Sequence, residues 1–184
     1  MAVISKFTTS GDFWRAMVIR DCDDSRINPA DLRYALHAAN SLFHMHDWVF
    51  HTHAISMQAA PPKRAYRFTY KQISGPTITV STHKEFANAL ETANNDFGRI
   101  RGIANAGKHL RLDDIRPVQN APSNAANTRI QTTAFGQGGY GAGPYGGSAR
   151  VMLEGDNGSD WEFSSIRENV FRMWEALISL NLWH

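Results

Sequence analysis

The sequence has little cysteine, no long apolar run and almost no excess of charge of one sign. Its single cysteine, Cys22, excludes an intrachain disulfide and a cysteine-based zinc site. No apolar run approaches the roughly 20 residues that span a bilayer, so we expect no membrane partner. Lysine and arginine total 19 against 17 aspartates and glutamates. This balance excludes a uniformly basic nucleic-acid-binding surface but permits a local basic patch.

What is present suffices for one folded domain. The chain has 184 residues, of which 42% are hydrophobic, and no internal repeat divides it. We therefore expect a single domain over residues 1–184 with a substantial core. The N-terminal residues lack the apolar stretch of a secretory signal, which favours a cytoplasmic location.

Helical periodicity predicts two helices in the first third of the chain. A short helix is expected after Ser10, ending at the acidic run 21–25. Asn28 can cap a second helix, since Pro29 suits the first helical position. Its apolar face repeats to Phe50, so we expect a helix from about Pro29 to about Ala54.

Two further helices are predicted from capping boxes, in which a hydroxyl and a carboxylate satisfy free backbone N–H groups. Thr82-x-x-Glu85 begins a long helix that should end by Leu112, and Ser165-x-x-Glu168 begins the last one. We expect the core to be dominated by aromatic side chains, namely Trp14, Phe43, Phe50, Phe86, Phe97, Phe171 and Trp174.

Strand periodicity occurs in two places. Between residues 65 and 81 apolar and polar residues alternate, which indicates short strands or an extended surface loop. Segments 128–135, 149–154 and 161–163 predict a small antiparallel hairpin or meander, with a tight turn at Asp156-Asn157-Gly158. We expect a flexible hairpin tip at 136–147, which holds seven of the fourteen glycines. The predicted fold is thus a mostly α helical bundle with a β insertion around 128–163, before the last helix.

A polar ridge near the end of the predicted third helix is the first candidate site. Arg101, Asn105 and His109 follow one another at intervals of four, so they share one helix face. Arginine can neutralise a phosphate, asparagine can position it and histidine can transfer protons. Lys108 and Arg111 would add positive charge for substrate binding. The alternative is a basic last turn that complements the helix dipole.

A helical bundle with an Arg…His motif late in a long helix resembles the HEPN superfamily. Its members are small, mostly helical bacterial domains, and many are metal-independent endoribonucleases of toxin–antitoxin or antiviral systems. The resemblance implies an RNA substrate, catalytic roles for Arg101 and His109, and a homodimer. It covers the two long helices and the terminal helix.

A second candidate site is a histidine stripe within residues 37–53. His37, His44 and His51 recur every seven residues, and Asp47 lies between the last two. His44, Asp47 and His51 could provide part of a site for a divalent transition metal. One helix rarely completes such a site, so another helix would have to supply a ligand, for example His109 or Asp96. The alternative is an ordinary polar helix face.

A third candidate is the basic, aromatic segment 63–71. Lys63, Arg64 and Arg67 lie close to Tyr66 and Phe68. Cations interleaved with aromatic rings suit single-stranded RNA, which binds through its phosphates and by base stacking. The same alternation is typical of a half-buried strand.

Three functional hypotheses follow. The first is an RNA-acting, metal-independent endoribonuclease that needs no cofactor. The second is a non-catalytic binding or structural module. The third is a metal-binding helical bundle. A catalytic thiolate is disfavoured, because Asp21 and Asp23 flank Cys22 and would raise the thiol pKa.

Overall fold

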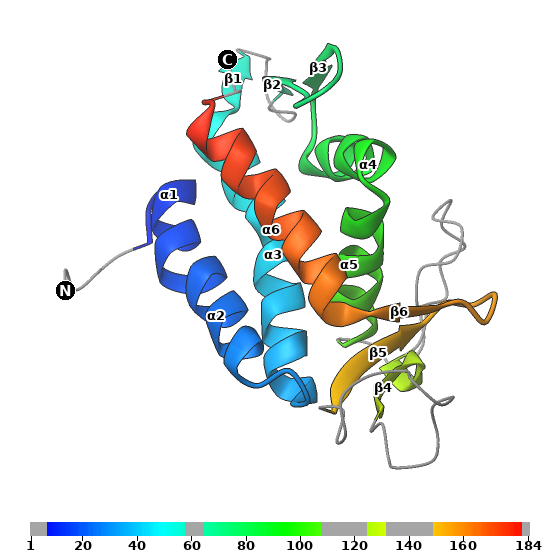
Figure 1. Ribbon diagram of the computed structural model, residues 1–184. Helices are drawn as coiled ribbons and strands as arrows, with labels where there is room; N and C mark the ends of the chain where they lie inside the picture. Colours follow the sequence, from blue (N-terminus) through cyan, green and yellow to red (C-terminus); the bar gives the residue numbers. More distant parts are fainter. Residues whose placement is uncertain (1–6, 58–64, 108–124, 132–148, 182–184) are drawn as a thin grey trace.

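The structure is a computed structural model, and it describes residues 7–57, 65–107, 125–131 and 149–181 (Figure 1). The described chain is mostly helical, with two small antiparallel sheets. Helix α3 lies at the centre, and α6 crosses it (Figure 1). The N-terminal helices flank α3 on one side, and α4 and α5 on the other. No helix among the described residues is both long and apolar enough to cross a membrane.

The N-terminal helix is longer than predicted and contains a π-helical segment. It consists of α1 (Ser10–Phe13), the π-helix η1 (Trp14–Val18) and α2 (Ile19–Ile27). A capping box between Thr9 and Asp12 begins it. The sequence had led us to expect that the acidic run 21–25 ends the helix. That expectation was wrong, because the helix continues to Ile27. Cys22 and Ser25 face the core within this run, Asp21 is half-buried, and Asp23 and Asp24 are exposed.

Helix α3 (Leu32–His53) lies close to its predicted bounds. Asp31 caps it instead of Asn28: the Asp31 carboxylate accepts a hydrogen bond from the Arg33 N–H at 2.8 Å. The predicted apolar face is the one that packs, because Phe43, Val49 and Phe50 are all buried.

The predicted long helix is two helices, α4 (His83–Ala93) and α5 (Asn95–Ala106). Asn94 breaks it, with an extended backbone (φ −146°, ψ 104°). Its side chain accepts a hydrogen bond from the Asp96 N–H at 3.0 Å, so it caps α5. Asparagine is favoured at such a cap and has only modest helix propensity, which explains the break.

The last helix, α6 (Phe163–Ser179), begins earlier than predicted. Ser165 and Glu168 therefore lie inside it and do not form a capping box. Glu168 instead accepts hydrogen bonds from Arg26 of α2. On the buried face Trp174 is fully enclosed, and its Nε1–H donates to the Leu42 carbonyl at 3.0 Å. This bond ties α6 to α3 at the centre of the core.

Two three-stranded antiparallel sheets complete the fold, where only the second had been predicted with a definite topology. The first contains β1 (Ile55–Met57), β2 (Ala65–Lys71) and β3 (Thr77–Val80), in that order. The second contains β4 (Thr128–Gln131), β5 (Arg150–Glu154) and β6 (Asp160–Glu162). As predicted, a tight turn joins β5 to β6, and Gly158 adopts a positive φ of 79° there. The insertion before the last helix is thus a meander.

The aromatic core is largely as predicted. Trp14, Phe43, Phe50, Phe86, Phe97 and Trp174 are buried, whereas Phe171 is only partly buried. Phe97 and Phe86 both place their rings edge-on against Trp174. The helices that carry the candidate sites are therefore anchored on one aromatic cluster.

Candidate metal centre and adjoining groove

The C-terminal half of α3 and the first residue of α4 bring two imidazoles and a carboxylate together. Asp47 and His51 are four residues apart on α3 and share one face. His83 begins α4. Ligand atoms of these three side chains all lie within 4.8 Å of one another. Asp47 is half-buried and both histidines are exposed, so the cluster lies at the surface with its polar atoms accessible.

The start of α4 fixes the position of His83. Thr82 caps the helix by accepting a hydrogen bond from the Glu85 N–H at 3.1 Å. Glu85 reaches back to accept from the Ser81 N–H at 2.7 Å. The His83 ring then lies 6.0 Å from the His51 ring and 6.3 Å from Phe50, measured between centroids. The predicted capping signal therefore has a consequence for the site, because it orients a residue next to α3.

Two further histidines of α3 lie beside the Asp47 carboxylate. His44 Nδ1 lies 3.2 Å from Asp47 Oδ2, and His46 Nε2 lies 3.4 Å from Asp47 Oδ1. Burial alone would raise the pKa of Asp47, but the hydrogen bond from His44 and the nearby rings of His46 and His83 outweigh it. The net result is a pKa below the ordinary value, so the carboxylate is ionised at neutral pH and available to a cation.

His46 contacts this carboxylate from the protein interior. Its Nδ1 lies 2.5 Å from the Phe43 carbonyl oxygen, which can only accept, so Nδ1 carries the proton. The side chain is 4% exposed, and burial lowers its pKa to about 4. A neutral ring protonated at Nδ1 turns the Nε2 lone pair toward Asp47. The inner wall of the cluster therefore presents the Asp47 carboxylate and the Nε2 lone pair of His46, which are both electron-pair donors.

Of the predicted metal ligands, Asp47 and His51 lie close together, and His44 forms a hydrogen bond with Asp47. His83, from another helix, lies with Asp47 and His51, and sequence reasoning missed it. Asp96 is bonded to Arg99 and Asn169 instead, and His109 lies outside the described residues. The sequence did show a histidine, His83, at the start of a predicted helix. It did not show that this helix start lies beside Asp47 and His51.

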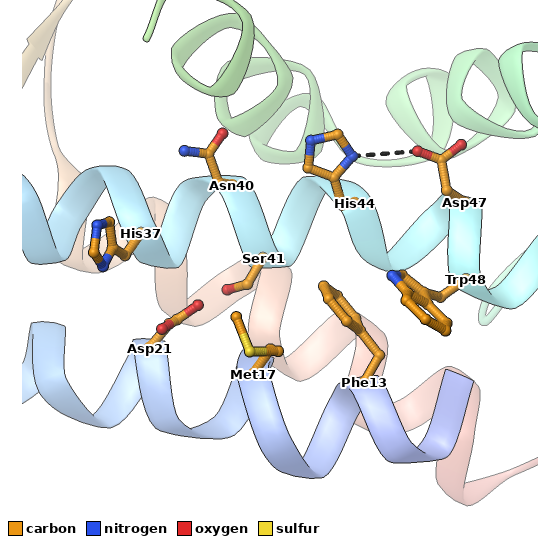
Figure 2. A pocket seen from close by; sticks show the side chains of 9 residues that line it. All are labelled: Phe13, Met17, Asp21, His37, Asn40, Ser41, His44, Asp47 and Trp48. Atoms are coloured by element: carbon orange, nitrogen blue, oxygen red, sulfur yellow. Dashed lines mark hydrogen bonds and ion pairs between the residues drawn. The ribbon is translucent and has the colours of Figure 1, made fainter. Parts of the chain in front are cut away.

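A groove continues from Asp47 along α3 (Figure 2). It has a volume of about 400 Å³ and lies between α3 and the helix formed by α1, η1 and α2. His37, the first histidine of the stripe, lines it near Asp21, and His44 lies beside Asp47. His37 and His44 thus border the groove, whereas His51 belongs to the cluster, and Asp47 is common to both.

The polar ridge of α5 has a different environment. Arg101 is 7% exposed, and its Nη1 donates to Asn88 Oδ1 at 2.7 Å and to Glu91 Oε2 at 2.9 Å. Both partners belong to α4. Arg101 therefore joins α4 to α5 across the break at Asn94, and Asn105 is half-buried on the same helix. His109, Lys108 and Arg111 lie outside the described residues.

The basic, aromatic segment is a strand where the structure describes it. Arg67 is exposed on β2, while Phe68 and Tyr70 are buried. Phe68 and Tyr70 both pack against Phe86 of α4. The rings of Phe68 and Tyr70 therefore lie in the core and are not available for base stacking, whereas Tyr66 is only partly buried. Lys63 and Arg64 lie outside the described residues.

Cys22 is buried and has a thiol pKa of about 12. Burial is the main cause, whereas the neighbouring Asp21 and Asp23 carboxylates contribute less. The sequence thus predicted the correct direction of the Cys22 pKa shift, but it did so from the flanking carboxylates, which are the smaller cause.

Comparisons with known protein families, curated proteins and solved structures find no match for this chain.

Proposed function

We propose that this protein binds one divalent transition-metal ion, zinc foremost, through Asp47, His51 and His83. The observation that carries the proposal is the meeting of these three ligand atoms, from two helices, within 4.8 Å. Two imidazoles and one carboxylate form a donor set that suits zinc, and also iron(II).

The spacing is compatible with coordination after a small adjustment. Two ligands on one tetrahedral zinc lie roughly 3.4 Å apart, given bonds of about 2.0–2.1 Å. The ligand atoms of the cluster lie within 4.8 Å of one another, so none is more than about 1.4 Å too far from another for this geometry. His51 and His83 are exposed, so their side chains are free to rotate by that amount. Asp47 is held in place by His44, as carboxylate ligands commonly are by neighbouring hydrogen bonds.

Three protein ligands leave at least one coordination position for water. A zinc-bound water has a pKa near 7 in catalytic sites, which makes hydrolysis the chemistry that such a centre supplies. Both histidines are exposed, so water would have access to a metal held by these residues. The proposed function is therefore metal binding, with water activation as the reaction class it supports.

The direct test is metal titration of the full chain, purified without a polyhistidine tag and treated with EDTA. We expect one zinc or cobalt ion per chain. His83→Ala and Asp47→Asn should each weaken binding by at least about 100-fold, since loss of a direct ligand should exceed the effect of losing a supporting contact. His37→Ala is the matched control, because it removes a histidine of the same helix outside the cluster, and it should leave affinity unchanged. Substoichiometric metal, or equal affinity in all variants, would overturn the proposal.

The HEPN-like, RNA-acting alternative rests on the resemblance and on the ridge of α5. Its main described residue, Arg101, is buried and paired with Glu91, so the geometry favours the metal centre. Cleavage of labelled RNA separates the two. EDTA-resistant cleavage that His109→Ala abolishes would support the ribonuclease, whereas cleavage that requires added zinc and is lost in His83→Ala would support the metal centre.

A further inference from the structure

The groove beside the metal centre has one wall of apolar side chains. Phe13 and Trp48 stack with their ring centroids 5.0 Å apart and their planes 11° apart. Met17 lies next to them and is 39% exposed. A volume of about 400 Å³ falls within the range of small-molecule sites. This wall can cover the apolar body of a ligand.

The polar part of the groove carries two negatively charged hydrogen-bond acceptors, the carboxylates of Asp21 and Asp47. Asp21 and Asp47 line it from opposite helices (Figure 2). Neither carboxylate is paired with a lysine or arginine among the residues the structure describes; Asp47 contacts the imidazoles of His44 and His46. Asn40 also lines the groove, but its amide oxygen is buried and has no hydrogen-bond partner within the described part of the chain.

Asp21 is the carboxylate best placed to bind a ligand. It is half-buried, and in Figure 2 it points toward Ser41 and His37 of α3. Burial raises its pKa, an effect that the Ser41 hydroxyl and the His37 ring only partly oppose. A positively charged group beside Asp21 would compensate the cost of burying its charge.

We infer that the groove binds a small organic cation, with a primary ammonium at Asp21 and an apolar body along Met17 toward the Phe13–Trp48 wall. Asp21 follows Met17 by about one helical turn and Phe13 by about two, since these residues lie four and eight positions before it. An aryl-alkyl amine matches that length and polarity. Anionic ligands would meet two carboxylates and are disfavoured.

This inference is independent of the proposed metal site, because Asp21 is not among the metal ligands. It also gives Asp47 a second role, as the residue where the groove meets the cluster. Binding at the Asp21 end should therefore persist when metal is removed.

The test uses three probes with one body and different charge: 2-phenylethylamine, 2-phenylethanol and phenylacetate. Each is titrated by two-dimensional NMR into the full chain in EDTA at pH 7. We expect the amine to bind with a dissociation constant about tenfold lower than that of the alcohol, and phenylacetate to bind more weakly still. Asp21→Asn should abolish the preference for the amine.

Asp24→Asn is the matched control, since it removes an exposed carboxylate from the same helix outside the groove. It should retain the preference. Equal binding of amine and alcohol, an unchanged preference in Asp21→Asn, or an equal loss in both variants would each overturn the inference. Because metal is absent, a failed zinc titration leaves this result unaffected.

Discussion

Helices α3 and α5 each carry polar side chains at helical spacing, and their surroundings are opposite. On α3, His44 and Asp47 border a groove and a cluster of ligand atoms at the surface. On α5, Arg101 points against α4 and is neutralised there by Glu91. Helical spacing brings polar groups to one face in both cases. Whether a ligand can reach them depends on which element packs against that face.

The largest expected effect is the loss of stability on replacing Arg101. If Arg101 proved dispensable for stability, the contrast between α3 and α5 would not hold. Arg101→Met should lower the free energy of unfolding by about 4 kcal/mol, because the Glu91 carboxylate, 13% exposed, would lose its charged partner. Urea denaturation measures it.

Arg172→Met is the control for that measurement. Its side chain is 73% exposed and pairs with Glu168 at the surface, so we expect a loss of less than about 0.5 kcal/mol. If both variants lost equally little, Arg101 would not be structural, and the ridge of α5 would again be a candidate phosphate-binding site.

A second prediction compares buried and exposed histidines within α3 itself. Burial lowers the pKa of His46 from 6.5 to about 4, although Asp47 opposes the shift. The unfolded chain therefore takes up this proton more readily than the folded one. The associated stability is complete above pH 6.5 and is lost as the pH falls toward 4, by up to about 3 kcal/mol.

The measurement is urea unfolding in EDTA between pH 7.5 and 4.5, for the wild type and for His46→Gln. The variant keeps a hydrogen-bond donor but does not titrate in this range, so its stability should fall less steeply with acid. Parallel pH profiles would show that His46 is not the group responsible.

The smallest expected effect concerns the start of α5. Asn94→Ala should cost about 1 kcal/mol, because the Asp96 N–H loses its side-chain acceptor. Asn94→Asp keeps an acceptor and should be nearly neutral in thermal unfolding. If aspartate proved as costly as alanine, capping would not explain the effect of this residue.

Local signals in the sequence predicted those parts of the fold that depend on neighbouring residues. Apolar periodicity located α3 to within a few residues, and the Asn157-Gly158 turn located the β5–β6 hairpin. The break at Asn94 was missed because apolar residues continue at helical spacing on both sides of it. Asn94 caps α5 in the structure, but in the sequence pattern it could not be distinguished from other polar residues of a helix.

The candidate site was predicted only where one helix supplies it. Asp47 and His51 share a face of α3, which spacing alone reveals. His83 joins them because the start of α4 packs beside α3, and Arg101 is enclosed because α4 packs against α5 across the break at Asn94. Both facts depend on tertiary packing, which one sequence does not specify.

The π-helical segment Trp14–Val18 changes the angular position, around the helix axis, of the residues that follow it relative to those that precede it. Phe13 and Asp21 are eight residues apart and would lie about 80° out of line on a continuous α-helix. The wider π turn takes up most of that offset, so both residues face the groove while Trp14 and Val18 remain in the core. Shortening the segment by one residue would rotate Asp21 away from the aromatic wall without changing any residue that lines the groove.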